Sequence, residues 1–538
     1  MCIPAPLRTR SAAARRAPAF ARPLSAAALL VALAALAACS KDNGPSADAP
    51  APSAPPHDST EDVAEPTGDE DATEAGAEVP LFDPLVTHGA ELHPPVRGMT
   101  VRRGTIHLHT GYSHDACDGE VWLKDADPED ADGETILAVT GSSHLMVVDR
   151  WHQCNQDVRR AVCEVHQDFL FFTDHNNNYP SFEYPDVLLY QPEDGDELIM
   201  RDGAPAAMWM TCPDGRRVLM SAGVDTHLLA FGLERHVVED IDERRRIYGT
   251  RTEEAVEMLR DAGALVVSGY SDEWDPDLLF ALPFDGFEIY NPATNLRGNL
   301  AATGSLLADM ILRPAQAPHP QLTLLPVFEE NEENLWRWSR LSEIRPIFNY
   351  LGTNAHQNVF REPTFEGERI DSFRRMMSWF ANYVLIDEAI EHADDRQLKE
   401  IIGAGRHYGV FEFLGIALGF DYHATRGEDL WEMGARIPLD PGAVTLHVAV
   451  PTLHGAMHED MEPPEITARI LRAHDDDWVV VAEGAESFSA EVTDPGVYRV
   501  DVRMVPHHLR GWLGSKADEY IRDVVWVYSN PIFVGVHL

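Results

Sequence analysis

The chain has 538 residues, of which 44% are hydrophobic and 9% aromatic, enough to bury the core of a barrel-sized domain and of a small partner domain. Its formal net charge is −45 at pH 7. Because nucleic-acid backbones are bound by basic patches, this charge argues strongly against a nucleic-acid partner. An acidic protein can still bind phosphate where metal ions reverse the local field.

The first 38 residues have the pattern of an export signal. A basic region ends at Arg22, and the apolar run at 24–33 is too short to span a bilayer comfortably. The next segment, Leu36-Ala37-Ala38-Cys39, resembles the bacterial lipoprotein cleavage box, which implies cleavage before Cys39 and a lipid on its sulfur. Such a lipid would anchor the protein in the cell envelope, and Ser40 resembles the signal for the outer membrane. An ordinary signal peptide with an incidental cysteine is the alternative.

Residues 39–90 are predicted to be a disordered acidic tether. The stretch from 40 to 80 is rich in Pro, Ala, Asp, Glu, Ser and Gly and has almost no large apolar side chain. Such a composition buries too little surface to offset the entropy of ordering. The tether would hold the folded part away from the membrane.

Between residues 95 and 425, strand-like runs alternate with helical patterns. The predicted strands are 104–109, 169–173, 218–223, 264–268, 286–290, 322–327 and 347–352, and the predicted helices are 252–262, 371–380 and 388–402. This rhythm predicts a parallel sheet or barrel whose functional residues lie at the carboxyl ends of the strands.

Two long insertions, 110–168 and 176–217, carry four cysteines. These are Cys117, Cys154, Cys163 and Cys212. An even number in an oxidising envelope predicts two disulfides, with three possible connectivities. Ligation of a metal by the thiolates is the alternative, and the chain has no Cys-x-x-Cys spacing to favour it.

From about residue 437 the pattern changes to short alternating strands separated by turn residues. They are expected at 444–450, 466–471, 478–482, 496–505 and 524–528. This pattern predicts an antiparallel β-sandwich over residues 437–538.

The ends of the first two strands carry metal-binding side chains. His107 and His109 point the same way because side chains alternate along a strand. The second strand ends in Asp174-His175. Two imidazoles on one face can chelate a divalent metal, and the Asp-His pair at the end of the second strand could supply its next ligands.

With these residues in hand, the region from 103 to 425 resembles the PHP (polymerase and histidinol phosphatase) domain. The motifs are His107-Leu108-His109-Thr110, Thr173-Asp174-His175-Asn176 and Gly352-Thr353-Asn354-Ala355-His356, in the expected order. The resemblance implies an α/β fold, a distorted (β/α)7 barrel holding up to three divalent metals. The ending at 526–534 is similar to the C-terminal sandwich of larger secreted members.

Carried over residue by residue, the resemblance implies a set of metal ligands. These are His107, His109, Asp115 (with His114 as the alternative), His175, Asp225, His227, Asn354 and His356. Three positions depart from the family pattern: Asp225 replaces the usual Glu, Asn354 replaces Asp, and 267–270 lacks a histidine. We therefore expect one or two metals, unless a neighbouring carboxylate substitutes; the candidates are Asp272, Glu273 and Glu288.

Imidazoles and carboxylates suit Zn, Mn or Fe. Such metals activate water and polarise a phosphoryl oxygen, so we expect hydrolysis of a small-molecule phosphoester. Arg361 is predicted to clamp a phosphoryl oxygen, and His227 or Asp174 to act as general acid or to orient a ligand. The alternatives are hydrolysis of an amide or carbamate, and a degenerate barrel kept as a binding or scaffolding lipoprotein.

Overall fold

The computed structural model describes residues 80–124, 127, 129, 131–226, 228–387, 393–438, 442–474 and 477–536. All of them belong to one compact unit of the chain. The predicted signal peptide, the tether up to residue 79, Cys39 and His227 lie outside the described residues. Within the described part, none of the helices combines the length and the apolar character needed to cross a bilayer.

Seven strands of the described chain close into a barrel. They are β1 (Met99–Leu108), β5 (Phe169–Phe171), β9 (Arg217–Asp225), β10 (Leu228–Leu233), β11 (Leu265–Ser268), β12 (Gly286–Tyr290) and β13 (Phe348–Ala355). They pair in this order, and β13 returns to pair with β1. The β9–β10 and β10–β11 pairs are antiparallel and the others parallel, so one barrel strand comes from a hairpin.

The prediction of a strand at 322–327 is wrong. The chain there forms two short 3₁₀ turns, η9 (Pro320–Leu322) and η10 (Leu325–Val327). Pro320 and Pro326 lack the N–H that a ladder needs and fix φ at a value suited to the start of a turn. The seventh place in the barrel is taken by β10.

The predicted helices form, with one shifted start. α4 (Glu253–Asp261) begins after Thr252, which caps it, and α9 (Phe373–Trp379) begins after Ser372. α10 (Asp395–Gly403) starts later than predicted because Asp394 and Gln397 form a capping box that fixes the first turn there.

Large apolar side chains fill the interior of the barrel. Ile106, Phe171, Phe231, Val267 and Tyr350 are buried in one cluster, and the rings of Phe171 and Phe231 lie 5.2 Å apart. A packed interior leaves no pore, so polar groups with chemistry are confined to the strand ends.

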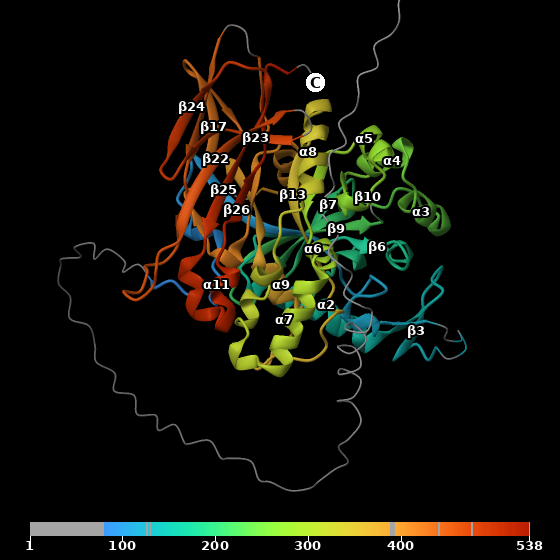
Figure 1. The fold of residues 1–538 in the computed structure, drawn as a ribbon. Helices are drawn as coiled ribbons and strands as arrows, with labels where there is room; N and C mark the ends of the chain where they lie inside the picture. The colour runs from blue at the N-terminus through green and yellow to red at the C-terminus, as the bar shows by residue number, and fades with distance from the viewer. Residues whose placement is uncertain are drawn as a thin grey trace, which may run out of the picture. The chain divides into compact units, whose positions relative to one another are not determined.

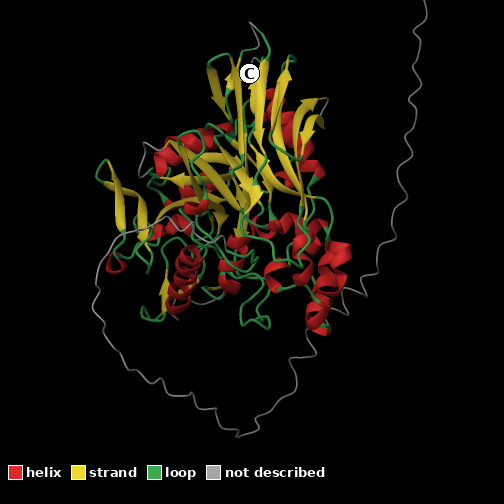
Figure 2. Cartoon of the chain, turned by 90° about the vertical axis from the view of Figure 1, so that its left-hand side faces the viewer, coloured by secondary structure: helices red, strands yellow, loops and turns green. Residues whose placement is uncertain are grey.

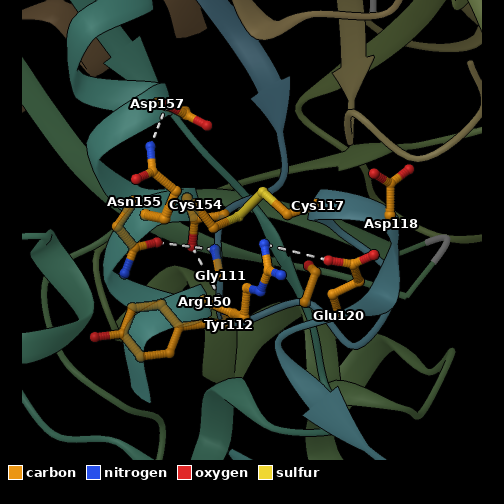
Figure 3. The surroundings of a disulfide bond; sticks show 12 residues. Gly111, Tyr112, Cys117, Asp118, Glu120, Arg150, Cys154, Asn155 and Asp157 are labelled. Carbon is orange, nitrogen blue, oxygen red and sulfur yellow. Dashed lines mark hydrogen bonds and ion pairs between the residues drawn. A yellow bond between two sulfur atoms is a disulfide. The ribbon is translucent and has the colours of Figure 1, made fainter. Parts of the chain in front are cut away.

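Both insertions are held by disulfides. Cys117 is bonded to Cys154, and Cys163 to Cys212. Cys154 and Cys163 both lie on α2 (Val148–Glu164), so this helix ties the two insertions together. Figure 3 shows the first disulfide beside the Glu120–Arg150 ion pair. The two bonds confirm the prediction of two disulfides, show which of the three connectivities forms, and exclude these thiols as metal ligands.

The strands predicted after residue 437 are present as β20 (Val444–Ala449), β22 (Glu465–His474), β23 (Asp477–Gly484), β25 (Gly496–Val505) and β26 (Val524–Ser529). β22, β23, β25 and β26 form one antiparallel sheet. Figure 2 shows long strands, drawn as yellow arrows, gathered around the C-terminus. β20 belongs to another sheet, between β17 (Asp421–Arg426) and β24 (Phe488–Val492). The packing of these two sheets as a sandwich stays a prediction.

The C-terminal sheet is joined to the barrel by hydrogen bonds. β26 pairs with β15 (His407–Val410), β15 pairs with β14 (Ala381–Asp387), and β14 pairs with β1. α8 (Glu332–Ile344) lies along the same sheet (Figure 1), and the Trp338 ring lies 5.0 Å from that of Trp478. The barrel and the C-terminal strands therefore share one core.

Candidate metal centre

Four histidines and two aspartates from successive strand ends meet at one end of the barrel. They are His107 in β1, His109 just after it, Asp115, His175 in β6 (Asp174–His175), Asp225 at the end of β9 and His356 after β13. Asp225 Oδ2 lies 3.4 Å from His107 Nε2, 3.5 Å from His109 Nε2 and 3.7 Å from His175 Nδ1. On the other side, Asp115 Oδ1 lies 3.5 Å from His175 Nε2, and its Oδ2 lies 3.6 Å from His356 Nε2.

These side chains make three overlapping groups whose donor atoms lie within 4.8 Å of one another. The groups are His107, His109 and Asp225; His109, His175 and His356; and His114, Asp115 and His175. The first group is fully buried, whereas the side chains of His175 and Asp115 are 21% and 35% exposed. The cluster therefore opens to solvent on the side of Asp115.

The Nδ1 atom of each of the four histidines faces an oxygen. The partners are Glu288 Oε1 for His107 (2.6 Å), Ser113 Oγ for His109 (2.9 Å), the carbonyl of Asn354 for His356 (2.9 Å) and the carbonyl of Asp225 for His175 (3.3 Å). Carboxylates and carbonyls only accept, so the rings of His107, His175 and His356 carry a proton on Nδ1 and turn Nε2 toward the shared centre. The Nε2 atoms of His107 and His109 are buried with no hydrogen-bond partner among the described residues.

Asp174 fixes the proton on His109. Its carboxylate accepts from the amide and hydroxyl of Thr110 and from the hydroxyl of Ser113 at 2.7, 2.8 and 2.8 Å. Burial raises the pKa of Asp174 to about 6, so the group is mainly ionised at neutral pH and must accept. Because Ser113 donates to Asp174, its oxygen accepts from His109. The contacts of Asp174 are thus those of a residue that positions a ligand.

Glu288 holds His107 from behind. Besides the His107 ring, it accepts the amide of Tyr270 at 2.7 Å and the side chain of Asn291 at 3.1 Å. A Cβ on Gly352 would lie 1.8 Å from Glu288 Oε1, so only glycine leaves room for this pair. The structure therefore places Glu288 as a support for the His107 ring. Asp272 and Glu273 contact Thr294 and Arg297 instead.

A hydrogen bond joins Tyr270 and Asn354, which lie in two stretches where the sequence departs from the expected PHP pattern. Tyr270 follows Gly269, in the stretch 267–270 where the resemblance predicts a histidine, and it donates its hydroxyl to the amide oxygen of Asn354 at 3.0 Å. Burial raises the pKa of Tyr270 well above its usual value, so it stays a neutral donor. A pair of potential ligands is thus replaced by a hydrogen-bonded pair.

The backbone is strained at these positions. His107, Tyr270 and Asn354 have φ values of 66°, 49° and 49°, in the left-handed region that favours glycine. Each costs about 1–3 kcal/mol and persists only where the surroundings impose it. At His107 the strain coincides with a shift of register between β1 and β13, which re-aims the ring.

The ionisation of the four rings is uneven. Burial opposes the charged form of His107 and His175, but neighbouring carboxylates outweigh it and raise their pKa values to about 10 and about 9. Burial and nearby imidazoles lower the pKa of His109 well below its usual value and that of His356 to about 4. Hydrogen bonding to His175, against the effect of burial, holds the pKa of Asp115 well below its usual range.

Arg361 is not brought into this cluster by any contact that the described residues show. Its exposed guanidinium contacts the carbonyl of Asp118 and the carboxylate of Glu120, at 3.1 and 3.3 Å. Its predicted role as a phosphoryl clamp stays a prediction. Glu288 was predicted as a substitute ligand or a strand-end hydrogen-bond acceptor, and the structure places it as an acceptor for His107. The roles of Ser113 and Tyr270 were not predicted, because their partners Asp174 and Asn354 lie 61 and 84 residues away in the sequence.

No protein-family model and no curated protein matches the chain. A similar solved structure is that of a two-domain protein from Bacteroides vulgatus containing a predicted PHP-like metal-dependent phosphoesterase. The alignment covers 82% of this chain and 98% of that protein, at 11% sequence identity and a TM-score of 0.30. A TM-score this low carries no weight for function.

Proposed function

We propose that the protein is a metal-dependent hydrolase of phosphoesters. The observation that carries the proposal is the convergence of four imidazole Nε2 atoms, each with its Nδ1 beside an oxygen, on Asp225 and Asp115. One or two divalent ions, Zn, Mn or Fe, fit this set of donors. The residues that would hold them are His107, His109, Asp115, His175, Asp225 and His356.

A divalent cation bound there supplies a Lewis acid for the phosphoryl oxygen and lowers the pKa of water. The chain supplies orientation: Glu288 and Ser113 lock two rings, and the burial of His107 and His109 keeps competing water away. His175 and Asp115, at the open side of the cluster, lie where a substrate would arrive.

The reaction class is tested with protein stripped by a chelator and refilled with Zn²⁺, Mn²⁺ or Fe²⁺ under argon. Phosphomonoesters and phosphodiesters are assayed beside activated carboxyl esters and amides. We expect metal-dependent release of phosphate. Turnover of the carboxyl derivatives alone would replace the phosphoesterase proposal with the alternative hydrolase.

A second candidate, a non-catalytic metal-binding lipoprotein, is favoured by the Tyr270–Asn354 pair, which removes two potential ligands. Elemental analysis and turnover together separate the two candidates. Bound metal without turnover of any ester would favour the binding protein.

We also propose that the protein is exported and anchored in the bacterial envelope through Cys39. The two disulfides support an oxidising compartment. Replacing Cys39 by alanine should move the protein from the membrane fraction to the soluble fraction. Unchanged fractionation would contradict the anchor.

A further inference from the structure

A cavity of about 220 Å³ adjoins the metal centre. His356 and Asn354 form part of its wall, together with residues of α6 (Pro292–Gly298), α7 (Leu300–Leu312) and α9. These helices lie together beside the barrel in Figure 1. A group bound in this cavity would therefore touch a residue of the metal cluster.

The wall of the cavity is mainly apolar. Leu306, Leu324, Val327 and Met376 line it, and none of its described lining residues is a lysine or an arginine. A dianionic phosphate would have no counter-charge here, and burial of an uncompensated charge is costly. The phosphoryl group is therefore expected at the metal cluster, and only an uncharged group in the cavity.

Three polar side chains of the wall, those of Thr303, Thr323 and Asp371, are already engaged. Thr303 donates to the carbonyl of Asn299 at 2.9 Å, and Thr323 donates to the carbonyl of Pro320 at 2.8 Å. Asp371 accepts the amides of Val359 and Phe360 and an ion pair from Arg369. A hydroxyl of a sugar or another polyol placed against these three side chains would find no free partner there, which costs binding energy.

We infer that this cavity holds the alcohol portion of the substrate, and that this portion is apolar and about the size of one ring. An apolar cavity of about 150 Å³ suffices to bind benzene, so the present volume admits a phenyl group with small substituents or a short alkyl chain. The inference rests on the proposed function. Water cleaves the ester P–O bond, its hydroxyl ends on phosphorus, and its proton ends on the released alcohol.

The first arm of the test compares benzyl phosphate with glycerol phosphate, two esters of alkyl alcohols, on the metal-loaded protein. We expect kcat/KM for benzyl phosphate to be about tenfold higher or more, since even one methylene in an apolar pocket is worth about tenfold. Equal values for the two esters would overturn the inference and leave the proposed function in place.

The second arm measures binding of phenol by ligand-observed NMR, with no reaction involved. Leu307, which lines the cavity, is changed to aspartate; Leu300, on the same helix but 61% exposed and outside the cavity, receives the same change as control. We expect Leu307→Asp to abolish phenol binding and Leu300→Asp to preserve it. Ala293→Phe, which fills the cavity from α6, should also abolish binding. This second variant keeps the test decisive if Leu307→Asp fails to fold.

The two arms separate the two ideas. Phenol binding that depends on Leu307, without turnover of any phosphoester, would refute the proposed function and keep the apolar subsite. Turnover without phenol binding, or phenol binding unchanged in both Leu307→Asp and Ala293→Phe, would refute the subsite.

Discussion

At the scale of single residues, the orientation of the candidate ligands is set by the side chains that hydrogen-bond to them from outside the cluster. Glu288 and the Asp174–Ser113 pair decide which nitrogen of His107 and of His109 faces the centre. Such supporting residues fix the ring and raise its basicity, and their loss typically costs about 10–100-fold in metal affinity.

Changing Glu288 to glutamine should therefore weaken metal binding by about 10–100-fold while the fold persists. The amide keeps an acceptor for His107 but loses the charge that secures its proton. A titration against a chromophoric chelator measures the affinity. Glu273→Gln is the matched control, because Glu273 pairs with Arg297 away from the ligands. Equal affinities in the two variants would show that Glu288 has no part in the site.

Metal binding should release about two protons at pH 7. His107 and His175, with pKa values of about 10 and about 9, carry an extra proton in the metal-free protein and must lose it to offer Nε2. Affinity should rise as the pH increases from 7 toward 9, and fall in acid as all four rings protonate. Calorimetry in buffers of different ionisation enthalpy counts the protons. A pH-independent affinity with no proton release would contradict this assignment.

At the scale of elements, the strand ends were predictable and the connections were not. Alternation along β1 and the motif at β6 predicted His107, His109 and His175 as neighbours because strand ends converge. The sequence could not show β10 as a separate strand. Its apolar run begins three residues after Asp225, the end of β9, and no glycine or proline marks a turn between the two strands. Nor could it show the left-handed backbone at His107 and Tyr270, which tertiary packing imposes.

One disulfide should matter more to the metal centre than the other. The amides of Cys117 and Asp118 donate to the carbonyls of His356 and Gln357 at 2.8 and 3.0 Å, so the Cys117–Cys154 bond fastens two ligand loops to α2. Replacing Cys117 and Cys154 by alanine should lower metal affinity several-fold. Each bond also contributes about 2–5 kcal/mol to the free energy of unfolding.

Replacing Cys163 and Cys212 provides the matched control. This bond closes a loop of similar length but joins α2 to the strand region around Cys212, outside the cluster. Its loss should lower the unfolding free energy without changing metal affinity. If both double variants lose affinity equally, the first disulfide has no special link to the site.

At the scale of the whole molecule, the barrel depends on the C-terminal strands. β26 covers the edge of β15, and buried Arg499 lies 4.4 Å from the ring centroid of Trp478 and 4.8 Å from that of Trp338. The pattern of strands and helices and the PHP resemblance predicted a barrel followed by a separate β-sandwich. The shared sheet could not be foreseen, because pairing between distant strands leaves no local signal.

A chain ending at residue 436 should therefore aggregate or unfold. The truncation exposes an unpaired strand edge and the buried ring of Trp338. Gel filtration and thermal unfolding of the truncated and full chains measure the effect. A soluble, monomeric fragment with an unchanged Tm would show that the barrel is independent.

A crystal structure of the Zn²⁺- or Mn²⁺-loaded protein, with anomalous scattering to locate the metal, tests the account most directly. We expect the cation bonded through Nε2 of His107 and His109 and through Asp225, with Nδ1 of His107 still bonded to Glu288. A metal bound through Nδ1 atoms, or one lying outside this cluster, would contradict it.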